Sequence, residues 1–371
     1  MPAFTPDDEQ QMRRALALAA RGQGRVEPNP MVGCVITRGG RVIGAGYHHR
    51  FGGPHAEVEA LRACGGLARG GTVYVTLEPC CYHGKTPPCT DALIAAGVAR
   101  VVAPLADPNP RVAGRGFALL RQAGARVDVG LLRDAAAELN APFFKLVRRH
   151  RPWVILKWAQ SLDGKIATRT GNSKWISDQV CRAHAHRTRG RVDAILVGVG
   201  TVLRDDPLLT CRVGRPKCVA TRVVLDTHLR TPLRSKLVRT AGQIPTLMFC
   251  GKNATARRAR AFEQAGCIVQ RVAQTHDGVS LPAVLDILGR RQMTNVLVEG
   301  GGALLGRFFD ARLADELHVY IAPLLIGGRA APGPLNGQGV ATVARALRLP
   351  RNAQPCRLGT GYVLQTRLPG R

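Results

Sequence analysis

The sequence predicts two successive α/β domains. Its 371 residues are more than twice the roughly 150 residues that a typical domain contains. Short apolar, β-rich runs alternate with helix-like segments in both halves of the chain, which is typical of layered α/β sheets. A basic stretch that ends in proline, Arg148 to Pro152, interrupts this alternation and indicates a boundary. We therefore expect a first domain at residues 1–148 and a second at 152–371.

The first domain is expected to open with a helix and a β-hairpin. Thr5 is a suitable N-cap, because a proline and two aspartates follow it in the first turn. Apolar residues then recur at helical spacing until Gly22. The β-rich runs 31–37 and 41–47 are joined at a pair of glycines, which favours a tight hairpin.

Strands and helices should alternate through the rest of this domain. The apolar runs predict strands at 72–77, 100–104 and 125–129. Segments with helical spacing lie between them, around 55–63, 90–96 and 116–123. One further capped helix is expected over 133–147, immediately before the basic stretch.

The second domain repeats this pattern and ends differently. Strands are predicted at 153–158, 194–199, 222–225, 246–250, 268–272 and 295–298. The last two strand-like runs, 316–322 and 361–367, have no long helix between them. We therefore expect them to pair antiparallel at the edge of the sheet.

Arginine dominates the charge of the chain. The sequence has 53 basic and 25 acidic residues, a formal net charge of +28, and 45 of the basic residues are arginine. Such a charge attracts polyanions, so nucleic-acid binding has to be considered. The arginines are spread over every segment, however, and only 5% of the residues are aromatic and able to stack on bases. We expect no nucleic-acid partner.

Cysteine usage and hydropathy indicate a cytoplasmic protein. Eleven cysteines without regular spacing do not suit a secreted disulfide scaffold, and reduced thiols fit better. The first ten residues include three acidic residues and contain no apolar signal core. No run of 18 apolar residues occurs in the sequence. We expect neither a signal peptide nor a membrane span.

One group of residues in the first domain has the composition of a zinc site. His55 and Glu57 lie two residues apart, and Cys80 and Cys89 follow near another helix start. Zinc prefers a tetrahedron of nitrogen and sulfur ligands, and a catalytic site keeps its fourth position for water. The pattern predicts His55, Cys80 and Cys89 as ligands and Glu57 as the catalytic proton shuttle of a zinc deaminase.

Other interpretations of these residues stay open. They would also suit a purely structural zinc site, or reduced core thiols beside a helix-start histidine, and Cys81 could replace Cys80 as a ligand. Eight residues separate Cys80 from Cys89, where the usual deaminase motif has two. The inserted residues bring His83 and Lys85 into the region, which suits an anionic small substrate.

The segment 76–89, TLEPCCYHGKTPPC, closely resembles the deaminase half of the bifunctional riboflavin-biosynthesis deaminase-reductases. The blocks PNPMVG at 28–33, HAE at 55–57 and DPNPRVAG at 107–114 are similar to further blocks of that family. The resemblance implies a cytidine-deaminase-like three-layer domain. It also implies that the pyrimidine or its ribose phosphate is held by Asn29, His83, Lys85 and Asn109.

Three consecutive glycines mark a second candidate site. Gly300 to Gly302 follow the apolar run 295–299 and open a helical segment. Backbone amides at such a helix start can hold a pyrophosphate, although a tight strand-to-helix turn explains the glycines equally well. The chain has no proper GxGxxG fingerprint with a following ribose acid, so we do not expect a Rossmann dehydrogenase domain.

Residues 152–367 resemble the reductase half of the same family, an α/β domain that is similar to dihydrofolate reductase and uses NADPH. By this resemblance the cofactor contacts are Ala159, Trp175, Thr201, Asp205, Thr227, Gly301, Gly302, Ala303, Leu304, Leu305, Gly306 and Arg307. The substrate contacts are Ser173, Arg189, Leu209, Arg212 and Glu299. Their charges agree with this, because an arginine can fork onto a phosphate and a glutamate can hold ribose hydroxyls or an amine.

These observations predict a bifunctional enzyme of riboflavin biosynthesis. Zinc-dependent hydrolysis would deaminate 2,5-diamino-6-(5-phosphoribosylamino)pyrimidin-4-one, and NADPH would then reduce the ribosyl side chain to ribityl. The expected partners are small phosphorylated pyrimidines, with no nucleic acid and no membrane, and the sequence is compatible with a homo-oligomer. The alternative, a nucleic-acid-editing zinc deaminase with an appended domain, is favoured only by the net charge.

Overall fold

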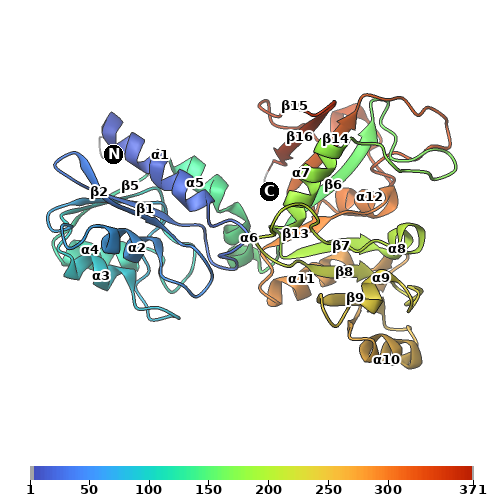
Figure 1. Cartoon of the computed structure of the whole chain (residues 1–371), viewed down its shortest axis with the longest axis horizontal. Helices are drawn as coiled ribbons and strands as arrows, with labels where there is room; N and C mark the ends of the chain where they lie inside the picture. The colour runs from blue at the N-terminus through green and yellow to red at the C-terminus, as the bar shows by residue number, and fades with distance from the viewer. Residues whose placement is uncertain (1–3, 370–371) are drawn as a thin grey trace. The chain divides into compact units, whose positions relative to one another are not determined.

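The computed structural model describes residues 4–369, and its chain divides into two compact units between His150 and Arg151 (Figure 1). Each unit is a β-sheet covered by helices and has its own hydrophobic core. The α/β class expected for both halves is therefore confirmed.

The first unit is a three-layer sandwich. Its sheet has the order β2-β1-β3-β4-β5, in which β1 runs antiparallel to β2 and β3, while β3, β4 and β5 are parallel. The strands are β1 (Gly33–Arg38), β2 (Arg41–Tyr47), β3 (Thr72–Val75), β4 (Arg100–Ala103) and β5 (Arg126–Val129). Two helices, α1 (Pro6–Ala20) and α5 (Arg133–Leu139), cover one face in Figure 1, and α2 (Ala56–Ala63), α3 (Cys89–Ala95) and α4 (Arg115–Gln122) cover the other.

The local signals at the start of this unit act as expected. Thr5 is the N-cap of α1, and it exchanges hydrogen bonds with Asp8 in a capping box. The hairpin turn between β1 and β2 contains Gly39 and Gly40, both with positive φ, a conformation that glycine adopts without steric cost. The predicted helix and hairpin are both confirmed.

The prediction of a single helix over 133–147 is wrong. The structure has two helices there, α5 and α6 (Ala141–Arg149), which meet at Asn140. Pro142 has no N–H to donate to a carbonyl of the preceding turn, so a continuous helix would lose a hydrogen bond. The buried Asn140 side chain instead accepts from the Met31 amide at 2.8 Å and donates to the Met31 carbonyl at 2.9 Å.

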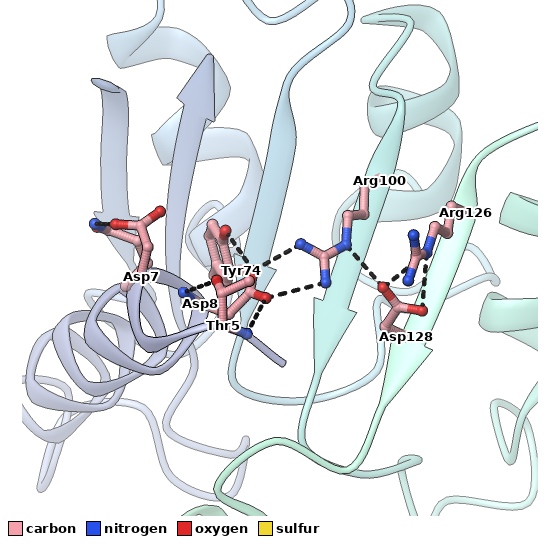
Figure 2. A network of polar contacts seen from close by, with 8 residues as sticks. Thr5, Asp7, Asp8, Tyr74, Arg100, Arg126 and Asp128 are labelled. Carbon is pink, nitrogen blue, oxygen red and sulfur yellow. Dashed lines mark hydrogen bonds and ion pairs between the residues drawn. The ribbon is translucent and has the colours of Figure 1, made fainter. Parts of the chain in front are cut away.

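A polar network holds α1 against the sheet (Figure 2). The carboxylate of Asp8, which is 2% exposed, accepts hydrogen bonds from the Tyr74 hydroxyl at 2.8 Å and from Arg100 Nη1 at 2.6 Å. Arg100 also donates to Asp128, which pairs in turn with Arg126. Burial raises the pKa of Asp8, but hydrogen bonds led by that from Arg100 lower it to about 2.

The second unit is built on a nine-stranded sheet of order β10-β9-β8-β7-β13-β6-β14-β16-β15. Its strands are β6 (Trp153–Ser161), β7 (Ala194–Gly198), β8 (Thr221–Leu225), β9 (Thr246–Gly251), β10 (Ile268–Val272), β13 (Asn295–Val298), β14 (Glu316–Ala322), β15 (Cys356–Leu358) and β16 (Gly361–Arg367). Its helices are α7 (Gln179–Arg189), α8 (Val199–Asp205), α9 (Lys236–Arg239), α10 (Ala256–Gln264), α11 (Leu281–Arg290) and α12 (Gly302–Asp310). The short strands β11 (Gln274–Thr275) and β12 (Gly278–Val279) form a separate two-stranded antiparallel sheet.

The first seven strands in this sheet order, from β10 at one edge through to β14, are parallel, so their carboxyl ends lie at the same edge of the sheet. The tail reverses this direction, because β16 pairs antiparallel with β14 from Glu316↔Arg367 to Ile321↔Tyr362. The antiparallel pairing predicted for this tail is confirmed. The three-residue strand β15 at the very edge was not predicted. No helix within residues 4–369 combines the length and the apolar character needed to cross a bilayer.

Candidate active sites

Three side chains in the first unit converge on one point. His55 is the N-cap of α2, Cys80 follows the end of β3, and Cys89 is the first residue of α3. Their ligand atoms all lie within 4.8 Å of one another, with His55 Nδ1 3.4 Å from Cys80 Sγ and 3.3 Å from Cys89 Sγ. One imidazole nitrogen and two thiols suit tetrahedral zinc and leave its fourth position open, so the donor set fits a catalytic zinc ion.

Glu57 lies beside this cluster in the first turn of α2 and is 3% exposed. Burial and the nearby Cys80 raise its pKa to about 7, which suits a group that must both accept and release a proton near neutral pH. In contrast to Glu57, Cys80 has a lowered pKa, because hydrogen bonds, led by that with Cys89, favour its thiolate. Cys81 is not part of the cluster, and its Sγ lies 3.7 Å from the Arg111 carbonyl.

Asn29, one of the four residues expected to hold the pyrimidine, contacts His48, which lies beside the cluster. Asn29 Nδ2 lies 3.2 Å from Nε2 of His48, whose other ring nitrogen lies 2.9 Å from the Pro54 carbonyl. With the His48 proton on Nδ1, which faces the Pro54 carbonyl, Nε2 accepts a hydrogen bond from the NH₂ group of Asn29. This bond sets the orientation of the Asn29 amide. The His48 and His55 rings are 5.2 Å apart, so Asn29 is positioned next to the cluster through His48.

The other three lie on loops around the cluster. His83 and Lys85 are exposed on the inserted segment, and the Lys85 ammonium is 3.9 Å from the centre of the Phe51 ring. Asn109 lies in the 107–114 loop, where its Oδ1 accepts from the Arg111 amide at 3.1 Å.

A cavity of about 1180 Å³ lies in the second unit at the carboxyl ends of parallel strands. It is lined by the ends of β6, β7, β8 and β13 and by the loops that follow them. The predicted cofactor contacts along it are Ala159, Trp175, Thr201, Asp205, Thr227, Gly301, Gly302, Ala303, Leu304 and Arg307. The predicted substrate contacts along it are Ser173, Arg189, Leu209, Arg212 and Glu299.

Two predicted cofactor contacts are absent from the cavity lining and pack against other parts of the unit. Leu305 is fully buried in the hydrophobic core, and Gly306 packs so tightly that a Cβ there would lie 2.3 Å from the Gly337 nitrogen. Gly301, the N-cap of α12, is the opposite case, because no atom lies within 4 Å of the position that its Cβ would take. This open cradle at a helix start fits the pyrophosphate of a dinucleotide.

The charged groups of the cavity form a buried cluster. Arg189 Nε and Nη2 donate to the two carboxylate oxygens of Glu299 at 2.8 and 2.6 Å. Burial would raise the pKa of Glu299, but the charges of Arg189 and Lys157 lower it to about 2. Two guanidinium nitrogens of Arg189 are therefore bound to Glu299, and its Nη1 donates to the Thr210 carbonyl at 3.4 Å. In the exposed Arg212, Nη2 lies 3.3 Å from Nε2 of His186. Of the two arginines expected at a phosphate, Arg189 is paired with Glu299 and largely buried, and Arg212 is an exposed residue of the cavity wall.

Both halves of the chain match known families. Residues 5–105 match the cytidine and deoxycytidylate deaminase zinc-binding region, and residues 152–364 match the RibD C-terminal domain. The riboflavin biosynthesis protein RibD of Actinobacillus pleuropneumoniae is 43% identical over 345 residues, which cover 93% of this chain and 91% of that protein. The chain belongs to the RibD family.

Further RibD proteins are similar to this chain over most of its length. RibD of Escherichia coli K12 is 44% identical over 328 residues, which cover 87% of this chain and 89% of that protein. The structure of Acinetobacter baumannii RibD, form 1, superposes with a TM-score of 0.87 at 35% identity and covers 98% of this chain and 99% of that one. A diaminohydroxyphosphoribosylaminopyrimidine deaminase/5-amino-6-(5-phosphoribosylamino)uracil reductase of Thermotoga maritima superposes with a TM-score of 0.83 at 34% identity, with the same coverage.

The expected family, fold class and pair of activities are thereby confirmed. This RibD family member is an enzyme of riboflavin biosynthesis, with a cytidine-deaminase-like deaminase domain and a reductase domain. The alternative of a nucleic-acid-editing deaminase is not favoured, because the relatives match both domains together.

Sequence reasoning missed three residues near the sites of this RibD chain. Lys157 and Tyr320 line the cavity, with the Lys157 ammonium 5.4 Å from the centre of the Tyr320 ring. A lysine inside the apolar run of β6 is a signal that could have revealed the first. The third, Glu78, accepts three backbone hydrogen bonds and lies two residues before Cys80, and its sequence neighbours gave no sign of these partners.

Proposed function

We propose that the first unit deaminates 2,5-diamino-6-(5-phosphoribosylamino)pyrimidin-4-one with zinc held by His55, Cys80 and Cys89. The observation that carries this proposal is the convergence of three ligand atoms within 4.8 Å, next to the buried Glu57. Zinc in this position would lower the pKa of water and supply a nucleophile at neutral pH.

Glu57 would move the protons of this hydrolysis. Its carboxylate would take one proton from the attacking water and pass it to the ring nitrogen, and would then take the second proton from the hydroxyl added to the ring and pass it to the leaving amine. A pKa of about 7 supports both roles near neutral pH. Asn29, oriented by His48, would hold the pyrimidine edge, and the exposed Lys85 would reach the substrate phosphate.

The second unit would reduce the deaminated product at C1 of its ribose, in the opened imine form, to the ribityl chain. The open backbone cradle at Gly301 supports a dinucleotide there, and NADPH would supply the hydride. Arg212 would bind the 5′-phosphate, because it is an exposed arginine that lines the cavity.

Lys157 would supply the proton that this reduction consumes. Burial lowers the pKa of Lys157, which makes its ammonium a better acid, whereas Glu299 is held ionised and can only accept hydrogen bonds from the ribose. Arg189 would hold Glu299 in place through its two hydrogen bonds.

Incubation of the purified protein with the diaminopyrimidine phosphate tests both steps. Ammonia release without NADPH, followed by NADPH oxidation once the cofactor is added, is the expected result. NADPH oxidation that precedes or replaces ammonia release would contradict the order of the two reactions. Absence of ammonia release from zinc-loaded protein would refute the proposed deaminase substrate.

The organisation of the enzyme is also proposed. The deaminase would occupy residues 1–148 and the reductase 152–371, with zinc in the former and NADPH in the latter. Eleven cysteines without a disulfide support a reducing, cytoplasmic setting. The enzyme would bind small phosphorylated pyrimidines and no nucleic acid. Assembly into a homo-oligomer is compatible with this proposal.

A further inference from the structure

Glu78 connects the zinc-ligand segment to a distant loop. It lies after β3, two residues before Cys80, and is 4% exposed. Its Oε2 accepts hydrogen bonds from the amides of Asp107 at 3.0 Å and Gly114 at 2.9 Å, and its Oε1 accepts one from Phe117 at 3.3 Å. Both ends of the 107–114 loop are therefore bound to one buried carboxylate.

The same carboxylate completes the start of α4. The N-cap of this helix is Gly114, which has no side chain to accept a hydrogen bond, and Phe117 is the third residue of the helix. Glu78 accepts from both amides, and its negative charge is favoured at a helix N-terminus. Gly116 permits this close approach, because a Cβ there would lie 2.2 Å from the Pro79 carbonyl oxygen and 3.2 Å from Glu78 Oε1.

The loop that Glu78 holds also contacts the residues that follow Cys80. The Asp107 side chain accepts from the amide of Asn109 at 2.8 Å, so the position of Asn109 depends on that of Asp107. Cys81 Sγ lies 3.7 Å from the Arg111 carbonyl, and the Arg111 guanidinium is 5.8 Å from the Tyr82 ring. The carboxylate and these contacts join the loop to the metal-ligand segment at several points.

We propose that Glu78 is a positioning residue of the deaminase: it fixes the 107–114 loop, and Asn109 with it, at the correct distance from Cys80. Glu78 touches neither the metal ligands nor the reacting atoms, and it acts through the backbone of the loop. The proposal rests on the proposed deamination and on the expectation, taken from the family resemblance, that Asn109 contacts the pyrimidine or its ribose phosphate.

Glu78→Gln is the variant that tests this role. A glutamine has one acceptor oxygen, so its NH₂ group must face either the Phe117 amide or the two loop amides of Asp107 and Gly114, which share Oε2. Either orientation weakens the attachment of the loop and of the start of α4 to this side chain. We expect KM for the diaminopyrimidine phosphate to rise about tenfold, with kcat changed less than about threefold, because Asn109 would bind the substrate less well in a displaced loop. Zinc content and reductase kcat/KM of the same chain should equal those of the wild type.

Two controls and a double variant separate positioning from stability. Glu59→Gln removes the same charge from a surface pair with Arg62, and it should leave deaminase KM unchanged. Asp8→Asn weakens the network on the α1 side of the same unit, and should lower stability without raising KM. Asn109→Ala should raise KM by itself, and Glu78→Gln should add less than about twofold to it, because both changes weaken the same interaction with the substrate.

Several outcomes would overturn the inference. An unchanged KM in Glu78→Gln, or independent effects that multiply in the double variant, would remove the link to Asn109. An unchanged KM in Asn109→Ala, with normal deamination by the wild type, would do the same and leave the proposed reaction intact. Absence of ammonia release from the wild type would instead refute the proposed function. If Glu78→Gln loses zinc or cooperative unfolding, Glu78→Asp, which keeps the charge on a shorter side chain, must show the same rise in KM.

Discussion

Arg189→Ala would leave the buried carboxylate of Glu299 without its bidentate partner. The two side chains are only 16% and 10% exposed, and both hydrogen bonds are shorter than 3 Å. Removal of one partner from a buried pair costs about 3–5 kcal/mol in unfolding free energy, because the other charge stays buried. Lys157 remains as a second positive charge near Glu299, so we expect the lower end of this range, about 3 kcal/mol.

The loss should depend on pH in a defined direction. In the wild type the pKa of Glu299 is lowered to about 2, so the ionised carboxylate stabilises the fold above its unfolded pKa of about 4.3, and this contribution disappears as the pH falls toward 2. Without Arg189, burial is opposed mainly by Lys157, and the pKa of Glu299 rises. The difference in stability between variant and wild type should therefore be largest near pH 7 and shrink below about pH 4.

Urea unfolding between pH 3 and pH 7, combined with reductase kinetics, measures both effects. Arg189→Ala should lower kcat/KM for substrates with and without the 5′-phosphate, because it disturbs Glu299. Arg212→Ala is the matched control: this exposed side chain should change stability by less than about 0.5 kcal/mol and cost one to two decades in kcat/KM, about 1.5–3 kcal/mol, only with the phosphorylated substrate. Wild-type stability of Arg189→Ala, with a loss confined to the phosphorylated substrate, would refute the assigned roles.

The remaining predictions concern the first unit and the division of the chain. Cys80→Ala should lose both zinc and ammonia release while reductase activity persists, and zinc retained at full occupancy would contradict the ligand assignment. Glu57→Gln should keep zinc, measured by metal analysis, and slow deamination by about 10² to 10⁴. Asp8→Asn should lower the free energy of unfolding by about 1.5–3 kcal/mol at pH 7, and the deficit should vanish as the pH falls from about 4 toward 2, since the pKa of Asp8 is lowered. A fragment that ends at Arg149 should deaminate without NADPH, and one that starts at Arg151 should reduce the deaminated product; a folded second fragment that binds NADPH but cannot reduce that product would show that the site needs another chain segment.

Local signals in the sequence determined much of the architecture and predicted the residues of the candidate zinc site. The N-cap at Thr5, the glycine turn between β1 and β2 and the alternating apolar runs each depend on a few neighbouring residues, and the structure follows them. His55 and Glu57 could be predicted as neighbours because their spacing at one helix start limits where their side chains can lie. In the other half the three glycines at 300–302 indicated a possible pyrophosphate site, and the remaining reductase residues were reached only through resemblance.

Tertiary structure decided which distant charges meet. Arg189 and Glu299 are 110 residues apart, and only the order of the parallel strands brings the end of α7 to the end of β13. The same is true of Glu78, whose three amide partners lie 29 to 39 residues further along the chain. Periodicity and capping report on neighbours within a few residues, whereas a buried carboxylate takes whichever donors the packing of the sheet and its helices places around it. The sequence therefore determined the chemical groups and their local elements, and the fold determined their partners.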